Sequence, residues 1–159
     1  MPKLTSHLWF AQHAEEAVRF YTGLIPGSSV GAKAVIPTDT PSGPAGSVYQ
    51  IAFTLGGQSF MALNAGPLDP FNHSFSIMVE CETQAEIDRL WEALLVGGQV
   101  EQCGWLKDRY GVSWQIIPTG FEAMMRDPDQ TKVKRAADAM LQMIKFDIAK
   151  LQAAFDGVG

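Results

Sequence analysis

The densest group of chemically capable side chains in this sequence lies at residues 103–118, CGWLKDRYGVSWQIIP. Alternate residues of a strand face opposite sides, so a strand here places Ser113 and Gln115 on one face and Trp114 on the other. We therefore expect Ser113 and Gln115 to line a pocket and Trp114 to lie in the core. Trp105 either lines the same pocket, where it would suit a flat ligand, or packs in the core.

Other polar side chains in the sequence have a structural as well as a chemical interpretation. Asp108 is expected to accept hydrogen bonds from the amides of its own turn rather than to take part in catalysis. Cys103 has no base near it in the sequence, and a free cysteine usually behaves as a small buried hydrophobe. Asn64, just before Gly66, either offers its amide to a ligand or caps the turn there.

The first part of the chain is predicted to fold as strand, helix and three strands. A strand is expected within residues 3–10, followed by a helix from Ala14 that Pro26 and Gly27 end. Another strand precedes a Pro- and Gly-rich loop at 37–46. The Gly56–Gly57 pair then predicts a hairpin between two strands, because both central positions of a type I′ turn need positive φ.

The second part of the chain repeats this order. A strand is expected at residues 74–81, and Thr83 with Glu86 forms a capping-box pattern at the start of an amphipathic helix. Two short strands within 101–107 and a last strand ending at Pro118 follow. These elements predict an α+β fold of paired βαβββ modules, at about 1–67 and 73–118, that form a curved mixed sheet in a domain of residues 1–118. Residues 119–159 are predicted to be a helical extension, with helix starts near Asp127 and Asp147.

Composition narrows the possible partners and compartment. The 159-residue chain carries a net charge of −5 and no basic cluster, so nucleic acid is not an expected partner. No apolar run reaches the length of a membrane span, and the first residues lack a signal-peptide core. Cys81 and Cys103 fit neither a disulfide framework nor a zinc motif, so we expect a cytoplasmic protein.

The sequence resembles the PhnB-like branch of the vicinal-oxygen-chelate superfamily, a branch also labelled 3-demethylubiquinone-9 3-methyltransferase-like. The superfamily includes glyoxalase I, bleomycin-resistance proteins and extradiol dioxygenases. The resemblance rests on LWFAQHAEEAVRFY, LGGQSFMALNAGP, SFSIMVECETQAEIDRLWEAL, CGWLKDRYGVSWQIIP and, in the extension, DPDQTKVKRAADAMLQMIKFDIAKL. It implies the paired βαβββ fold with a ligand cup lined by the sheet.

The resemblance also indicates where a metal would bind. Metal-using relatives hold the ion with a His on the first strand, a His or Gln on the first strand of the second module, and a Glu on the last strand. Here the first position falls on Ser6 or His7, the second on Ser74 or Ser76, and the third on Gln115. With His7 as the one good ligand, we expect no bound metal and no cofactor, a divalent ion being the less favoured alternative.

These observations leave two classes of function open. The protein either converts a small polar or aromatic metabolite in its cup, or binds and sequesters a small molecule as resistance proteins do. Methyltransferase activity is not expected, because neither Gly56–Gly57 nor Gly97–Gly98 sits in the loop that binds adenosylmethionine. The expected partners are a small-molecule ligand and a second copy of the chain, since the extension offers apolar helix faces to a homodimer. The candidate ligand-binding residues are His7, Asn64, Ser76, Trp105, Ser113 and Gln115.

Overall fold

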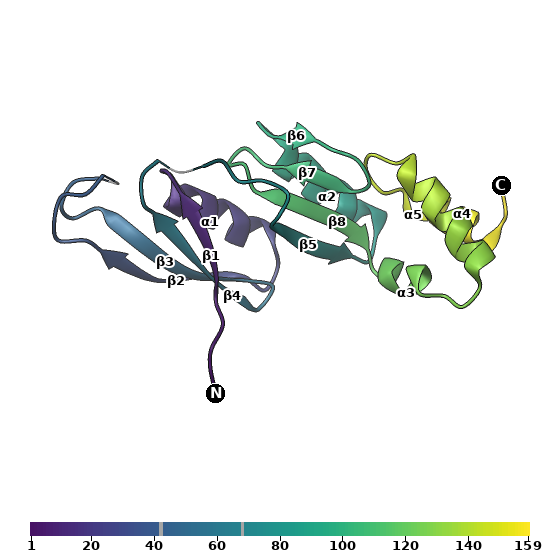
Figure 1. The fold of residues 1–159 in the computed structure, drawn as a ribbon, viewed down its shortest axis with the longest axis horizontal. Helices are drawn as coiled ribbons and strands as arrows, with labels where there is room; N and C mark the ends of the chain where they lie inside the picture. Colours follow the sequence, from purple (N-terminus) through teal and green to yellow (C-terminus); the bar gives the residue numbers. More distant parts are fainter. Residues whose placement is uncertain (42, 68) are drawn as a thin grey trace. The chain divides into compact units, whose positions relative to one another are not determined.

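The computed structural model describes residues 1–41, 43–67 and 69–159 of the chain. Ser42, which falls in the predicted loop at 37–46, and Leu68 lie outside the described residues. The described chain forms two compact units, Met1–Asp69 and Pro70–Gly159, and each holds one βαβββ module (Figure 1). The expected α+β class and the two-fold repeat of strand, helix and three strands are confirmed.

The first unit is a four-stranded mixed sheet with one helix. Its strands lie in the order β1-β4-β3-β2, with β1 parallel to β4 and the other pairs antiparallel. Hydrophobic residues at alternate strand positions, such as Leu8, Ile51 and Phe60, are buried against the apolar side of the helix. The elements are β1 Ser6–Phe10, α1 Ala14–Leu24, β2 Ser29–Val35, β3 Val48–Leu55 and β4 Gln58–Asn64. The predicted Gly56–Gly57 hairpin joins β3 to β4, with positive φ at both glycines.

The start of α1 is stabilised by a residue from the end of the same sheet. His13 occupies the N-cap position with a φ of 67° and makes no capping hydrogen bond through its side chain. Asn64 accepts a hydrogen bond from Ala14 N at 2.9 Å and donates one to Val48 O at 3.1 Å. Asn64 thus satisfies one of the free amide donors that begin a helix. Of the two roles weighed for Asn64, capping is closer to what the structure shows, but the group capped is a helix rather than the following turn.

The second unit builds the same module. Its strands lie in the order β5-β8-β7-β6, with β5 parallel to β8 and the other pairs antiparallel. The predicted capping box is present, since Thr83 accepts from Glu86 N while the Glu86 carboxylate accepts from Thr83 N. The elements are β5 Ser76–Cys81, α2 Gln84–Leu95, β6 Gln99–Val100, β7 Trp105–Lys107 and β8 Ser113–Pro118.

Trp114 and Asp108 form a buried polar contact in the core of this module. Trp114 is completely buried on the sheet face that α2 covers, and Asp108 is only 3% exposed. Asp108 accepts from Tyr110 N at 2.8 Å and Val112 N at 3.1 Å, and its other carboxylate oxygen accepts from Trp114 Nε1 at 2.8 Å. The expected burial of Trp114 and the turn-binding role of Asp108 are both found, and the bond between them ties the turn to the core.

The C-terminal extension packs on the second module. Its helices are α3 Phe121–Met125, which the sequence did not predict, α4 Gln130–Leu141 and α5 Ile148–Asp156. Phe146 and Leu151 are buried, so part of the apolar surface of the extension is used within its own chain. Leu141 and Ile144 nevertheless remain 57% and 53% exposed.

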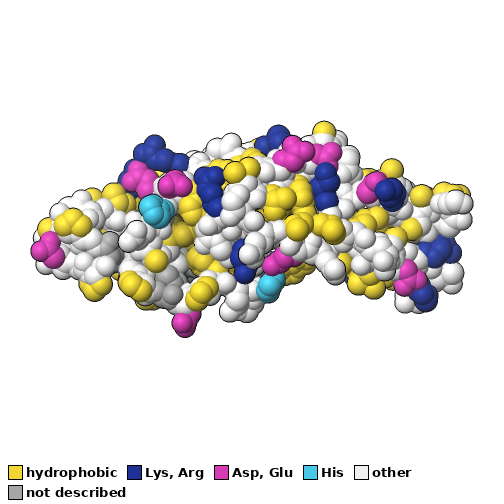
Figure 2. Space-filling view, turned by 90° about the horizontal axis from the view of Figure 1, so that it is seen from above, with side chains coloured by type: hydrophobic (Ala, Val, Ile, Leu, Met, Phe, Trp, Pro, Cys, Tyr) yellow, Lys and Arg dark blue, Asp and Glu magenta, His cyan; other side chains and the backbone are white. Residues whose placement is uncertain are grey.

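Basic and acidic side chains are mixed on the surface seen in Figure 2. On the face shown in Figure 2, Lys and Arg side chains are scattered among acidic ones rather than gathered into a patch. Binding to a phosphate backbone needs a concentrated basic face. None of the helices in the described parts of the chain has the length and apolarity of a membrane span.

Candidate functional site

Four of the six predicted ligand-binding residues lie on one face of the second sheet, opposite the face that α2 covers. Residues paired directly across neighbouring strands point to the same side, so the register defines rows of side chains across this face. We call it the open face. One row is Glu101, Trp105, Gln115 and Met78, and the next is Gln99, Lys107, Ser113 and Ser76.

Polar groups at the centre of the open face are close enough to interact. Gln115 donates through Nε2 to Ser76 Oγ at 2.9 Å, which links β8 to β5. Ser113 is 1% exposed, and its Oγ makes no hydrogen bond to any described residue. The predicted facing of Ser113 and Gln115 agrees with the register, but Ser113 is more deeply buried than an open cup would make it. A buried hydroxyl without a partner is costly, because desolvation is not repaid by a hydrogen bond.

A hollow of about 580 Å³ lies beside Trp105, lined by His73, Glu101, Gln102, Cys103 and Trp105. His73 Nε2 lies 2.7 Å from Glu101 Oε1, and the His73 and Trp105 ring centroids are 5.9 Å apart. Glu101 Oε2 is buried and has no hydrogen-bond partner in the parts of the chain that are described. The open face therefore carries a carboxylate and an imidazole next to an indole ring.

Sequence reasoning did not predict this pair, since neither His73 nor Glu101 is among the candidate ligand-binding residues. The two are separated by 28 positions in the chain. The available signal was that Glu101 lies just before the Cys103–Gly104 turn. Continuing the strand pairing past that turn would have placed it opposite Trp105.

The two remaining predicted residues, His7 and Asn64, belong to the first unit. His7 is exposed on β1, on the sheet face opposite α1. Asn64 uses both ends of its amide for the cap described above.

The residues at the expected metal positions of the second module are poor ligands for a transition metal. No group of three or more His, Cys, Asp or Glu that could hold a metal ion occurs among the described residues. At the expected positions of the second module stand Ser76 and Gln115, whose side chains bond to each other. A serine hydroxyl and an amide are weaker ligands than imidazole or carboxylate, so no chemical step is assigned to a metal here.

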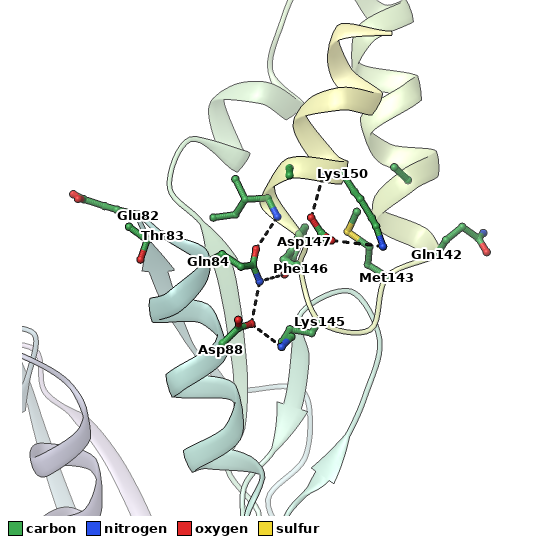
Figure 3. Close-up of a pocket in the computed structure, with 13 residues that line it drawn as sticks. Glu82, Thr83, Gln84, Asp88, Gln142, Met143, Lys145, Phe146, Asp147 and Lys150 are labelled. Carbon is green, nitrogen blue, oxygen red and sulfur yellow. Dashed lines mark hydrogen bonds and ion pairs between the residues drawn. The ribbon is translucent and has the colours of Figure 1, made fainter. Parts of the chain in front are cut away.

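A larger groove of about 1010 Å³ separates the start of α2 from the extension (Figure 3). Four of its charged side chains pair with each other: Lys145 contacts Asp88 at 2.6 Å, and Lys150 lies 3.6 Å from Asp147. The hydrogen bond from Lys145, with one from Gln84, holds the pKa of Asp88 below its ordinary value. Polar side chains that are paired in this way connect parts of the fold and are not free to bind a ligand.

The two cysteines differ in their surroundings. Burial raises the pKa of the Cys81 thiol from 9.0 to about 11, so this thiol stays protonated and unreactive at neutral pH. Cys103 is half-buried and lines the hollow beside Trp105. No base contacts it within hydrogen-bond distance among the described residues, so its geometry does not indicate a nucleophile.

Comparison with known proteins agrees with this fold. The family model for 3-demethylubiquinone-9 3-methyltransferase matches residues 2–117. A PhnB protein from Bacillus cereus, also described as a 3-demethylubiquinone-9 3-methyltransferase, is 35% identical with a TM-score of 0.66. The match covers 74% of this chain and 100% of that one. No curated protein matches the sequence.

More distant structures share the fold alone. Protein PA1353 from Pseudomonas aeruginosa is 22% identical, with a TM-score of 0.61 and coverage of 74% of this chain and 98% of that one. The fosfomycin resistance protein FosX from Listeria monocytogenes is 10% identical, with a TM-score of 0.51 and coverage of 77% and 96%.

The methyltransferase name of the family does not describe a site in this chain. Gly56–Gly57 forms the β3–β4 hairpin, and Gly97–Gly98 follows the end of α2. Neither pair lies between a first strand and a helix, where a glycine-rich loop would bind the cofactor of such an enzyme. The fold is that of the glyoxalase, bleomycin-resistance and dioxygenase proteins. By the family match over residues 2–117 and its identity to the Bacillus PhnB protein, the chain belongs to the 3-demethylubiquinone-9 3-methyltransferase family, in its PhnB-like branch.

Proposed function

We propose that the protein binds a small polar or aromatic molecule on the open face of its second sheet, without a metal. The observation that carries the proposal is the hollow of about 580 Å³ on this face, where the Trp105 ring lies next to the His73–Glu101 pair. A flat ligand in this hollow would stack on the indole ring and form hydrogen bonds to the imidazole or the carboxylate. The side chain of Trp105 supplies a flat apolar surface two strands from β5, and Gln115 supplies an amide between them.

Native mass spectrometry of protein purified without chelator tests the proposal, because it detects a retained small molecule together with any metal. Trp105→Ala should reduce the retained molecule, since its ring is the proposed contact. Thr22→Ala is the matched control, because the Thr22 hydroxyl donates to Val18 O within α1, away from the open face. If Trp105→Ala retains the molecule as fully as the control, the open face is not the binding site.

Catalysis is the second candidate function, and the His73–Glu101 pair favours it. A carboxylate that orients an imidazole beside a ligand hollow is a common arrangement for a general base. The retained molecule, once identified, should be incubated with the protein and examined for chemical change. Turnover that is lost in His73→Gln would establish the enzyme. An unchanged molecule would leave sequestration, as in resistance proteins.

The proposal includes a homodimer in a reducing cytoplasm. Leu141 and Ile144 on the extension, with Met78 on the open face, are large apolar side chains that stay exposed. Exposed apolar surface of this kind favours self-association. Sedimentation equilibrium at micromolar concentration should give twice the chain mass of 17.3 kDa, and a single species at the monomer mass would contradict the dimer. Free thiols at Cys81 and Cys103 suit the cytoplasm.

A further inference from the structure

The turn that leads into Trp105 has a strained backbone. In residues 102–105 the amide of Trp105 bonds to Gln102 O at 3.1 Å, and both central residues have positive φ, 56° at Cys103 and 80° at Gly104. This is the feature of type I′ turns, which favour Asn or Gly at both positions. Cysteine is an unfavourable residue at such a φ, so other contacts must hold the turn in place.

The C-terminal extension supplies those contacts through residues 143–148, which we call the anchor segment. Cys103 N donates to Met143 O and Gly104 N donates to Ile144 O, both at 2.8 Å. The two central amides of the strained turn are therefore satisfied by consecutive carbonyl groups of the extension. Without the anchor segment, both amides would depend on water.

The Phe146 ring occupies the space that a side chain at Gly104 would fill. A Cβ atom at Gly104 would lie 2.6 Å from the Phe146 ring and 2.8 Å from Ile116 O, closer than real Cβ atoms approach. Phe146 is 1% exposed, and Phe121 packs against its ring edge-on at 5.1 Å between centroids. Gly104 O also accepts from Ile116 N at 2.8 Å, so the ring presses on backbone that is bonded directly to β8.

Gln84, at the start of α2, fastens the other side of the anchor segment (Figure 3). Its Nε2 donates to Phe146 O at 2.9 Å and to Asp88 Oδ1 at 3.1 Å, and its Oε1 accepts from Ile148 N at 2.9 Å. One side chain thus holds the anchor segment at Phe146 and at Ile148. The anchor segment is therefore fixed to α2 and to the β6–β7 turn together.

We propose that Phe146 and Gln84 are positioning residues for the open face. Through the anchor segment they hold the Cys103–Gly104 turn in place. The turn in turn sets the position of Trp105 and the shape of the hollow beside it. The role of these two residues in shaping a ligand site rests on the proposed ligand binding at the open face. The extension, which lies beyond the residues that the family model matches, then shapes the site without contacting the ligand.

The test uses the full chain labelled with 5-fluorotryptophan, so that each of its four tryptophans gives a fluorine resonance. The Trp105 resonance is assigned by its loss in Trp105→Phe. Phe146→Ala should shift or broaden the Trp105 resonance while the Trp9 resonance, from the first unit, stays unchanged. The amides of Cys103 and Gly104 should exchange with deuterium at least about tenfold faster.

Arg135→Ala is the matched control within the extension. Arg135 donates to Ala154 O at 2.9 Å and to Phe155 O at 2.7 Å, so it joins α4 to α5 without contacting the turn. This variant should lower the melting temperature and leave the Trp105 resonance in place. Gln84→Ala, which removes three hydrogen bonds and no core side chain, should reproduce the Trp105 shift and serves if Phe146→Ala does not fold.

An unchanged Trp105 resonance in folded Phe146→Ala and Gln84→Ala protein, or an equal shift in Arg135→Ala, would overturn the positioning role. Because this readout needs no ligand, its failure leaves the proposed binding function untouched. Conversely, if Trp105→Ala and its control Thr22→Ala retain the same molecule, the binding proposal fails while the result for the Trp105 resonance stands. For an identified ligand, Gln84→Ala should weaken affinity by about tenfold.

Discussion

Replacing Trp114 with alanine should severely destabilise the second unit. The side chain is completely buried, and truncating a buried tryptophan typically costs about 3–5 kcal/mol. The same change removes the Nε1 donor at 2.8 Å from the carboxylate of Asp108, itself almost fully buried. Hydrogen bonds to charged groups contribute about 1.5–3 kcal/mol, so the total should lie at the upper end of the range for truncation.

Two further variants separate packing from hydrogen bonding. Trp114→Phe keeps most of the ring volume but loses the donor to Asp108, so it should cost about 1.5–3 kcal/mol. Gln115→Ala, one residue away on the opposite face, loses a single bond to Ser76 Oγ and should cost about 1 kcal/mol or less. The three variants therefore rank the two faces of β8 by their contribution to stability.

Urea unfolding followed by circular dichroism measures these differences. With a slope of about 2 kcal/mol per molar urea, Trp114→Ala should lower the midpoint by about 2 M, and Gln115→Ala by about 0.5 M or less. If Gln115→Ala proved the more destabilising, the assignment of Trp114 to the core face and Gln115 to the open face would be wrong. If Trp114→Phe had no effect, the Asp108 bond would not contribute to stability.

The remaining predictions each concern one or two residues. Elemental analysis of chelator-free protein should find well under one equivalent of Zn, Mn, Fe or Ni per chain, because Ser76 and Gln115 stand at ligand positions; a stoichiometric metal lost in Gln115→Ala would contradict this. Iodoacetamide at pH 8 should modify Cys103 and spare Cys81 in the folded protein. Burial raises the pKa of Cys81 from its unfolded value of 9.0 to about 11, so the contribution of the neutral thiol to stability is complete below pH 9 and falls as pH rises toward 11. Urea unfolding at alkaline pH should show this fall, and Cys81→Ala should remove it. Asn64→Ala should lower the free energy of unfolding by about 0.5–2 kcal/mol through loss of the α1 cap, measured by thermal melting, whereas Asn64→Asp keeps the acceptor for Ala14 N and should cost less. Cys103→Asn should raise the stability by about 0.5–1 kcal/mol, since asparagine tolerates the left-handed backbone of the turn better; a loss of stability in the same melting assay would mean that the thiol packs more favourably than its half-burial indicates.

Much of the module architecture was determined by local sequence signals. The Thr83–Glu86 capping box, the helical spacing of Ile87, Leu90 and Leu94, and the Gly56–Gly57 turn all act between residues close in the chain. Strand alternation also placed Trp114 and Gln115 on opposite faces, because the period of side chains along a strand is fixed. For this reason the order of elements and the facing of β8 could be predicted without tertiary contacts.

Only the tertiary structure decided how distant residues combine at the site. Asn64 caps a helix that begins 50 residues earlier in the chain. His73 pairs with Glu101 at a sequence separation of 28 residues, and Gln84 accepts a hydrogen bond from Ile148 at a separation of 64. Each of these contacts depends on which strands and helices become neighbours, and no local period encodes that. The packing partner of the extension could not be predicted from sequence either. Its amphipathic helices indicated that apolar surface must be covered, but the hydrophobic effect is not directional and does not specify what covers it. Because Gly104 has no side chain, the Phe146 ring can pack there, and part of the apolar surface of the extension is covered by the second module.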